Sequence, residues 1–525
     1  MAIALGLGFA NVAQAQKMSN ICGTTEADQD ILIQRLVENR DLMEKGLLED
    51  HSRGAKKYVP VKFHIIGKTD GSGRINEAKI FENLCQMNKD YADQDIVFYL
   101  QVDKNGDIFN YINNDNAYAN QSNSLGIASL NTQYKKFPNA INFFLVNFAS
   151  SENQLGGTTL GYYSPINDWL VIRNDNVNST SGTISHEIGH FFSLAHPFKG
   201  WDQKTCKDVY PTEWASGKEF QVTITKAPDG NTTVENADKS NCTTAGDFLC
   251  DTPADYNFGF DWNGCSLFTK KIKDPAGNFV DPEETLFMGY FIGCQKYIFS
   301  ADQKKAILAD YLSQKRAKIR PNYTPNIVDV TDKATLVSPI NGATAPYYNS
   351  VTFDWDDVPG ADRYLLEIDK SSSFTSATRF IVNSSMKVVT NLLPNVNVYN
   401  WRVVPFHSES GTCTALGQQS KGKFGTNDVV LSAKEISGVA DWTIAPNPAT
   451  SGTPIVIDVE ATNPFEAEVS LLNSIGQKIQ TLGNQQFTQG NNRLEIATKD
   501  VAAGIYFVQM QTGKAVVNKR VIVLN

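Results

Sequence analysis

The sequence HEIGHFFSLAH spans residues 186–196 and contains three of the six histidines in a chain of 525 residues. His186 and His190 are four residues apart, so on an α-helix their imidazoles lie one turn apart on the same face. The chain is expected to leave the helix over residues 189–193, which would bring His196 back as a third nitrogen donor. Three imidazole ligands leave one coordination position open, so this stretch predicts a catalytic zinc centre.

Glu187 stands next to the first of these histidines. Its direction on the helix does not reach the metal, but it does reach a water molecule at the open position. Zinc lowers the pKa of such a water toward about 7, and a carboxylate accepts the proton. Glu187 is therefore the candidate general base. The alternative interpretation is an amphipathic helix whose histidines only pack or face solvent.

The spacing of these four residues resembles that of the metzincin zinc proteases, whose pattern HExxHxxGxxH is followed by a methionine-containing turn. Ser193 stands where that pattern has glycine. Because glycine lets the chain leave the helix in a left-handed conformation, a serine there is expected to carry strain of about 1 kcal/mol. A second interpretation within the metalloproteases takes the third ligand from an acidic residue instead of His196.

A methionine turn is present in the sequence ETLFMGY at residues 284–290. The resemblance implies that Met288 forms an apolar floor beneath the histidines. It also implies that Tyr290 hydrogen-bonds the oxyanion of the tetrahedral intermediate. Ser300 is expected to cap a helix that continues to about Ile319.

Residues 241–255, NCTTAGDFLCDTPAD, combine two cysteines, a Gly-Asp turn and an Asp-Thr-Pro sequence. This combination resembles the pappalysin family of metzincins. The resemblance implies a structural calcium site with Asp247, Asp251 and Thr252 as candidate ligands, since calcium prefers hard oxygen donors. A loop of Asx turns without a metal is the alternative.

Some pappalysins prefer a basic residue after the cut, which requires an acid in the pocket near the methionine turn. Residues 289–293 contain no acid. The side-chain preference therefore stays open.

The N-terminal 56 residues precede the expected catalytic region. Residues 1–15 are apolar and end in Ala-Gln-Ala, as a secretory signal peptide does, although the usual basic start is missing. Residues 16–56 are polar, with helical periodicity over 28–48, and are expected to form a propeptide with an activation cut at Arg53.

Cys22 is the residue of interest in the expected propeptide. A thiolate is able to take the open zinc position and keep the enzyme latent until the segment is removed. Half of a disulfide or a free surface thiol is an equally weighted alternative.

Residues 57–320 alternate strand and helix patterns, which predicts an α+β metzincin-like domain with a mixed sheet. A helix is expected at 75–91, and strands are expected at 59–66, 96–102, 141–148 and 169–173. The last of these is expected to be the edge strand above the cleft, where an extended substrate can pair. His64 lies within a strand, so it is interpreted as structural. Residues 201–240 are interpreted as an insertion of unassigned role.

The composition shifts to β after Pro321, with short alternating strands and turn residues. Residues 331–427 resemble a fibronectin type III module, on the basis of Trp355, Gly-Ala-x-x-Tyr at 360–364 and Tyr-x-Trp-Arg-Val at 399–403. Their aromatic residues are expected to be core. Residues 428–525 resemble the C-terminal sorting domain of the type IX secretion pathway, on the basis of Ala-Pro-Asn-Pro-Ala at 445–449 and the segments 469–477, 503–508 and 519–523.

The net charge of −9 and the lack of a long basic run argue against nucleic acid or an anionic membrane as a partner. No later apolar run is long enough to span a bilayer. Five of the eight cysteines lie between residues 206 and 294, so at least one of them is free or pairs elsewhere.

Together these features predict a secreted or surface-attached zinc endopeptidase that acts on protein or peptide substrates. They also predict that the type IX secretion machinery is its export partner. A hypothesis of another class is a surface adhesin built on a non-catalytic protease domain, with its function in the β modules.

Overall fold

The computed structural model describes residues 20–44, 55–119, 136–149, 158–262, 264–265, 268–417, 419–429, 436, 438–513 and 515–524. The contacts divide the chain into two units. The first runs to Asp329 and includes His407–Cys413, and the second comprises the rest of the chain beyond Asp329. The predicted signal peptide at residues 1–15 and the predicted cut at Arg53 lie outside the described residues.

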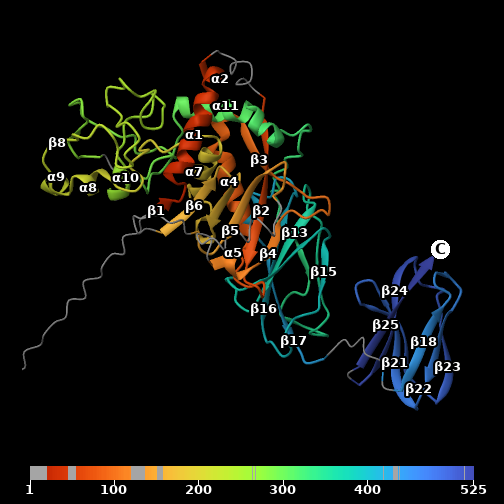
Figure 1. Ribbon diagram of the computed structural model, residues 1–525. Coiled ribbons are helices and arrows are strands. Elements are labelled where there is room, and N and C mark those ends of the chain that lie inside the picture. Colours follow the sequence, from red (N-terminus) through yellow and green to blue (C-terminus); the bar gives the residue numbers. More distant parts are fainter. Residues whose placement is uncertain are drawn as a thin grey trace, which may run out of the picture. The chain divides into compact units, whose positions relative to one another are not determined.

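The first unit is built on a seven-stranded sheet in the order β1-β6-β7-β5-β2-β3, with β4 paired to β2 (Figure 1). Strands β2, β3, β4, β5 and β7 are parallel to one another, and β6 is antiparallel to β7. The central β5 is apolar and buried throughout, as expected for a strand covered on both faces. The strands are β1 (Asn20–Cys22), β2 (Lys57–Gly67), β3 (Ile96–Leu100), β4 (Asn110–Asn113), β5 (Ile141–Val146), β6 (Thr158–Ser164) and β7 (Trp169–Arg173).

The prediction that residues 169–173 form the edge strand above the cleft is wrong. The strand exists as β7, but β6 pairs on its outer side, with Gly161 opposite Ile172. Strand β1 then adds to β6 in parallel, with Ile21 opposite Thr159. Strand β6 therefore lies between β7 and β1, and its sequence TTLGYYS lacks the apolar alternation of a typical strand.

Helices flank this sheet. The single helix expected over residues 28–48 is two helices, because α1 ends at a C-cap, Asn39. Ser300 caps α11 as predicted, and its side chain accepts a hydrogen bond from the Gln303 amide. That helix ends earlier than expected, and a 3₁₀ turn, Gln314–Ile319, follows it. The helices are α1 (Glu26–Glu38), α2 (Arg40–Glu44), α4 (Glu77–Asp90), α5 (Asp115–Ala119), α7 (Thr183–Phe191) and α11 (Ala301–Leu312).

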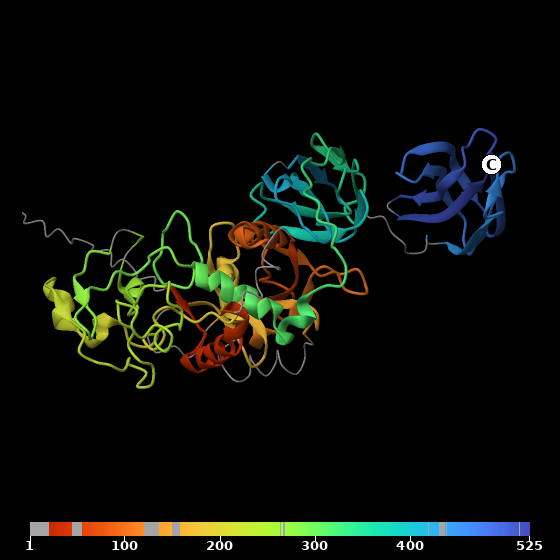
Figure 2. The same ribbon diagram turned by 90° about the horizontal axis from the view of Figure 1, so that it is seen from above.

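The region interpreted as an insertion is part of a loop-rich segment that extends to about residue 280. Figures 1 and 2 show it, coloured yellow to green, to one side of the sheet. Trp201, Trp214, Tyr256 and Phe258 belong to its buried apolar cluster, which also contains Tyr290. The segment thus forms a wall beside the methionine turn. Its elements are α8 (Cys206–Val209), α9 (Pro211–Ser216), β8 (Phe220–Gln221), α10 (Phe258–Asp261) and β9 (Ile272–Lys273).

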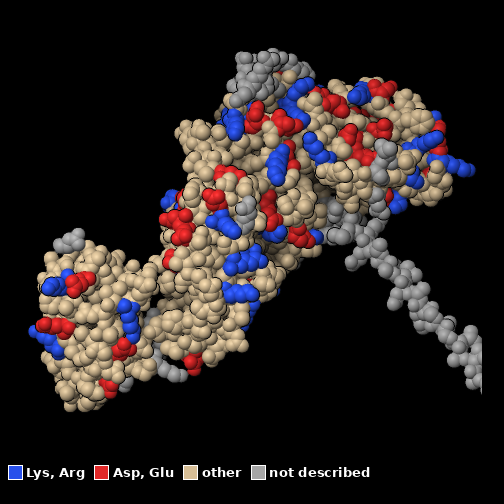
Figure 3. All heavy atoms as spheres, turned by 180° about the vertical axis from the view of Figure 1, so that it is seen from behind, with Lys and Arg blue, Asp and Glu red and all other residues tan. Residues whose placement is uncertain are grey.

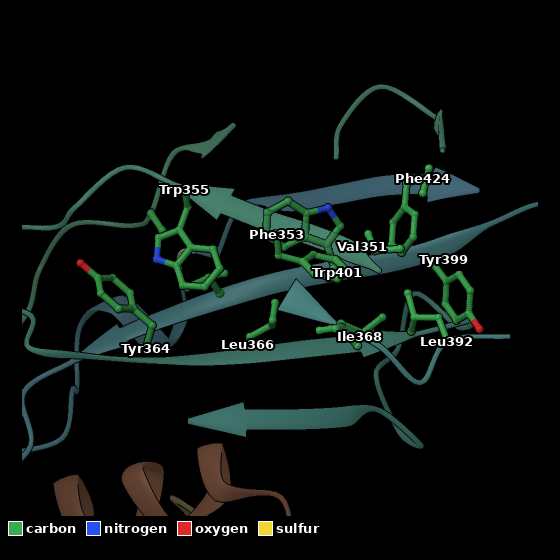
Figure 4. Close-up of a cluster of buried hydrophobic side chains, with 14 of the residues drawn as sticks. Val351, Phe353, Trp355, Tyr364, Leu366, Ile368, Leu392, Tyr399, Trp401 and Phe424 are labelled. Atoms are coloured by element: carbon green, nitrogen blue, oxygen red, sulfur yellow. The ribbon is translucent and has the colours of Figure 1, made fainter. Parts of the chain in front are cut away.

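The second unit begins with two facing sheets, β10-β12-β15 and β11-β17-β16-β13-β14. Figure 4 shows the side chains of Phe353, Trp355 and Trp401 among those that fill the space between them. These aromatic residues are core, as expected. The strands are β10 (Leu336–Ser338), β11 (Ala343–Ala345), β12 (Val351–Trp355), β13 (Arg363–Asp369), β14 (Thr378–Val382), β15 (Met386–Val389), β16 (Tyr399–Phe406) and β17 (Lys421–Thr426).

The C-terminal part also consists of two sheets, β18-β20-β23 and β19-β25-β24-β21-β22, around an aliphatic core. A mixed α+β region followed by β-rich sheets confirms the predicted fold class at this level. The strands are β18 (Val439–Ala445), β19 (Ala449–Thr450), β20 (Ile455–Ala461), β21 (Phe465–Asn473), β22 (Lys478–Phe487), β23 (Gly490–Ile496), β24 (Gly504–Thr512) and β25 (Ala515–Leu524).

The surface charges are mixed in sign (Figure 3), and six of the eight cysteines form disulfides. On the face shown in Figure 3, the basic and acidic side chains are interspersed. Among the described residues, no helix has the length and apolar character needed to cross a membrane. Cys206 is the free member of the five clustered cysteines, and Cys22 is also free. The disulfides are Cys85–Cys413, Cys242–Cys250 and Cys265–Cys294.

Candidate metal centre

Helix α7 and the turn after it bring the three motif histidines together. The Nε2 atom of His196 lies 3.2 Å from Nε2 of His186 and 3.1 Å from Nε2 of His190. Two nitrogens bound tetrahedrally to one zinc ion at about 2.0–2.1 Å are separated by about 3.3 Å. The His196 nitrogen is therefore spaced from the other two as the ligands of a single zinc ion would be.

The turn that carries His196 depends on Ser193, which adopts a left-handed conformation with φ of 69°. The Ser193 amide donates to the His190 carbonyl at 2.9 Å, and the Leu194 amide donates to the Gly189 carbonyl at 3.0 Å. These bonds close the helix end in the way that a glycine usually does. The serine therefore takes the conformation that the family pattern assigns to glycine, without loss of the third histidine.

Each motif histidine has an oxygen acceptor at its other ring nitrogen, Nδ1. The acceptors are the Phe287 carbonyl at 2.6 Å for His186, the Leu194 carbonyl at 2.7 Å for His190, and Oδ1 of Asp202 at 2.5 Å for His196. A proton held on Nδ1 leaves the Nε2 lone pair free for a metal. Burial lowers the pKa of His186 and of His196 to about 3, so both rings are neutral at physiological pH. Three converging lone pairs repel one another unless a cation lies between them.

Two further groups face the same point. The Cys22 thiol lies 3.4 Å from Nε2 of His190 and donates to Oε2 of Glu187 at 3.5 Å. The four possible ligand atoms of Cys22 and the three histidines all lie within 4.8 Å of one another. Oε1 of Glu187 is buried without a hydrogen-bond partner among the described residues, and burial raises the pKa of this carboxyl to about 8. The group fits a four-coordinate zinc ion with a thiolate in the fourth position.

The methionine turn lies beside and below this cluster. Met288 is fully buried, and a Cβ atom on Gly189 would collide with its sulfur, so the helix approaches the turn closely only because residue 189 is glycine. The Tyr290 hydroxyl accepts a hydrogen bond from the Cys22 amide at 3.1 Å and donates to the Cys22 carbonyl at 3.4 Å. Burial raises the pKa of Tyr290 well above its ordinary value, so the hydroxyl keeps its proton.

Helix α1 contacts the loop that carries the third ligand, which the sequence did not indicate. Gln29 is fully buried, donates to Oδ1 of Asp202 at 2.9 Å and accepts from the His196 amide at 3.0 Å. The Glu26 carboxylate accepts from the Gly200 amide at 3.2 Å. A capping pattern at Thr25 and a following charged helix were readable, but nothing in the sequence pointed to these partners about 170 positions away.

The loop of residues 241–255 is closed by the Cys242–Cys250 disulfide. Asp247 and Thr252 are buried there, and the Thr252 hydroxyl donates to Oδ1 of Asp247 at 2.9 Å. Asp251, the third predicted ligand, points elsewhere: its carboxylate accepts from the Ser300 hydroxyl and from the Asp302 amide, both at 2.7 Å. Asp251 therefore holds the start of α11.

Glu235, from the loop-rich segment, faces Asp247. Both of its carboxylate oxygens and Oδ2 of Asp247 are buried without hydrogen-bond partners in the described part of the chain. Burial, followed by the charge of Asp247, raises the pKa of Glu235 to about 10, and burial raises the pKa of Asp247 to about 7. Two buried carboxyls of this kind are costly unless protons or a cation compensate them. Glu235 carried no sequence signal, because it is one acid in a polar stretch.

Comparisons with known proteins place one part of the chain in a family. Residues 443–524 match the family described as the secretion system C-terminal sorting domain, within the predicted 428–525. This chain carries a sorting domain. The match indicates secretion or attachment at the cell surface, and it implies an interaction with the secretion machinery.

Two solved structures from Tannerella forsythia are similar to the chain. A promirolysin mutant has 16% sequence identity and a TM-score of 0.37, and the match covers 57% of this chain and 97% of that one. Mature mirolysin in complex with a cleaved peptide has 16% identity and a TM-score of 0.34, over 51% of this chain and 96% of that one. No curated protein sequence matches the chain.

Proposed function

We propose that this chain is a secreted zinc-dependent endopeptidase that its N-terminal segment holds latent. The observation that carries the proposal is the convergence of three Nε2 atoms and the Cys22 thiol on one point, with Oε2 of Glu187 3.5 Å from that thiol. His186, His190 and His196 would hold the metal. A zinc ion bound there would act as a Lewis acid on the scissile carbonyl and on water.

Glu187 is the general base of this proposal. Burial raises the pKa of this carboxyl, so it binds a proton more readily than an exposed glutamate does. It would take the proton of the attacking water and pass it to the leaving amine. In the described form its Oε2 is already engaged by the Cys22 thiol and the Thr24 hydroxyl, each at 3.5 Å.

Tyr290 is the proposed oxyanion partner. Its hydroxyl already hydrogen-bonds the main chain of Cys22, so a substrate backbone at the same place would meet the same group. A hydroxyl that keeps its proton is able to donate to a developing oxyanion in a buried site, where such a bond is strong.

Glu187→Gln in the full chain tests this function. The substitution keeps the shape of the side chain but removes the base, so peptide hydrolysis after removal of the N-terminal segment should fall by about 10²–10⁴-fold. Zinc content, measured on the purified protein, should stay the same. Glu213→Gln, an exposed glutamate of α9, is the matched control. Unchanged hydrolysis in Glu187→Gln would contradict the proposal and favour a binding protein with a non-catalytic protease domain.

Latency is proposed to rest on the whole segment 20–44, within the predicted propeptide 16–56. Cys22 occupies the metal centre, and β1 covers the β6 edge where an extended substrate would pair. Gln29 attaches α1 to the loop of the third ligand. Arg40 donates to the Phe248 carbonyl at 3.3 Å and so holds the far end of the segment. The segment must therefore leave the cleft before a substrate enters.

A second, structural cation site is proposed at Glu235, Asp247 and Thr252. Carboxylate oxygens of Glu235 and Asp247 that are buried without partners among the described residues support it, because a hard divalent cation such as calcium would compensate them. Asp251 is not included in this ligand set, because both of its carboxylate oxygens accept hydrogen bonds from the start of α11.

Thermal unfolding after chelation, with and without added calcium, tests this second site. Calcium should raise the melting temperature of the natural chain, and Glu235→Gln should abolish the response. Asp251→Asn should lower stability through the loss of hydrogen bonds at α11 but keep the calcium response. An equal response in Glu235→Gln would rule out this ligand set.

A further inference from the structure

A cavity lies directly beside Glu187. Its volume, about 380 Å³, is typical of small ligand sites. The segment of residues 176–183 forms one wall, and the segment that follows the methionine turn forms the other. His186 and Tyr290 also border the cavity, so it opens onto the atoms that would act on a peptide bond. The other side chains in its walls include Asn176, Asn178, Thr180, Ser181, Thr183, Phe287, Phe291, Ile292 and Tyr297.

The first wall is polar but uncharged. Oδ1 of Asn178 accepts from the Thr180 amide at 2.9 Å and from its hydroxyl at 2.8 Å. The Ser181 hydroxyl donates to Oγ1 of Thr183 at 3.0 Å. These bonds hold the wall in one shape and use up much of its own hydrogen-bonding capacity.

The opposite wall is mainly apolar and is held in place from both ends. The Cys265–Cys294 disulfide anchors it, and the Tyr297 hydroxyl donates to the Phe291 carbonyl at 3.0 Å. Phe287 and Phe291 are buried, whereas the Ile292 side chain is 37% exposed at the rim.

Among the described lining residues, the only carboxylate is Glu187, which faces the metal centre. Asp175 is adjacent in sequence to the first wall, but it does not line the cavity. It forms an ion pair with Arg173 at 2.5 Å instead. Because the reaction needs Glu187 itself, a cationic side chain that entered the cavity would lose water without a carboxylate free to pair with it, and an anionic one would find no lysine or arginine among the described lining residues.

We infer that this cavity receives the side chain next to the scissile bond and selects uncharged residues with an apolar stem. The inference rests on the proposed peptidase function and specifies the substrate class of that site. The selection acts mainly by exclusion, because burying an unpaired charge costs much more than burying an amide or a methylene group. Leucine, methionine and glutamine fit this description, and lysine, arginine, aspartate and glutamate do not.

The test uses the full chain after limited proteolysis has released the N-terminal segment. Peptides that differ only at the two residues flanking one cleavable bond are compared by kcat/KM, and the products are sequenced by mass spectrometry. We expect kcat/KM for leucine, methionine or glutamine at one of these positions to exceed that for lysine, arginine or glutamate by at least about tenfold.

A pair of variants connects the preference to the cavity. Ile292 and Ile298 are both 37% exposed and close in sequence, but only Ile292 lines the cavity. Ile292→Asp supplies the missing negative charge and should raise kcat/KM for arginine relative to leucine by about tenfold. Ile298→Asp should leave that ratio within about twofold of the natural value.

Three outcomes would overturn the inference. The inference about the pocket would be contradicted if the natural chain preferred lysine or arginine, or if both variants shifted the arginine-to-leucine ratio of kcat/KM equally. Either result would leave the proposed peptidase function intact. A zinc-loaded, processed chain that cleaves no peptide in the set would overturn the proposed function, and the pocket inference with it.

Discussion

His64 in the sheet and His190 in the metal centre are equally buried, at 1% and 0% exposed, but their ring nitrogens face different partners. Nε2 of His64 lies 2.9 Å from Oδ1 of Asn142. Nδ1 of the same ring lies 2.9 Å from Nδ2 of the Asn110 side chain. His190 has a carbonyl at Nδ1, whereas its Nε2 faces another imidazole and a thiol. Burial therefore does not distinguish a ligand from a structural histidine. The distinguishing feature of a ligand histidine is a ring nitrogen that faces other groups with lone pairs, as Nε2 of His190 does.

The largest effect on zinc content and hydrolysis is expected when a ligand histidine is replaced, and replacement of the structural His64 should not produce it. His196→Ala removes one of three ligands, so the zinc content should fall to near zero and peptide hydrolysis should fall by at least about 10³-fold. His64→Gln should keep the zinc content of the natural chain, because Asn110 and Asn142 hold this ring and not a metal. Both are measured by metal analysis and initial rates on the purified proteins. Full zinc content in His196→Ala would favour an acidic third ligand.

The second largest effect is expected from Cys22, whose thiol faces His190, and concerns the activity of the unprocessed chain. Cys22→Ala should raise the activity of the unprocessed full chain by about tenfold or more, because the fourth position is then free. Gln29→Ala should have a smaller effect, since it removes hydrogen bonds to the ligand loop worth about 1.5–3 kcal/mol and leaves the thiol in place. Cys206→Ala, the other free buried thiol, is the control and should stay latent. Latency that persists in Cys22→Ala would place the block in β1 and α1 instead of the thiol.

Acid should reveal the cost of charging His64. Burial lowers its pKa to about 4, against about 6.5 in the unfolded chain. Its contribution to stability is therefore complete above pH 6.5 and is lost as the pH falls toward 4, up to about 3 kcal/mol. Urea unfolding at pH 7 and pH 4.5 should show a larger loss in the natural chain than in His64→Gln. Equal losses in the two proteins would mean that His64 stays neutral without cost.

The smallest effect should come from the turn that places His196. Ser193→Gly removes the cost of a left-handed serine and should raise the free energy of unfolding by about 1 kcal/mol. Zinc content should stay unchanged. Ser193→Ala keeps the left-handed Cβ and should show no such gain in denaturant unfolding. A gain of the same size in both variants would assign the cost to the buried Ser193 hydroxyl, which lacks a partner among the described residues, and not to the backbone.

Local spacing explains why the cluster of three histidines was predictable. His186 and His190 share a helix face, and the turn at Ser193 returns His196 within six residues, so neighbouring positions specify the group. The placement of Met288 and Tyr290 could be anticipated only through the family pattern. The edge strand was misplaced because β6, the strand that covers β7, has a polar, glycine-containing sequence. The family pattern predicts Asp251 as a cation ligand, but a sequence does not reveal that Ser300 and Asp302 bind its oxygens.

The sequence by itself determined the helix, the order of its histidines, the glutamate beside them and the β character of the C-terminal half, because these follow from the identity and spacing of near neighbours. The tertiary structure alone decided what faces each polar group: Cys22 at the metal centre, Gln29 on the ligand loop, Glu235 against Asp247 and an uncharged cavity beside Glu187. Such pairings join residues from distant parts of the chain. They depend on how the sheet and the loop-rich wall pack, which no local periodicity encodes.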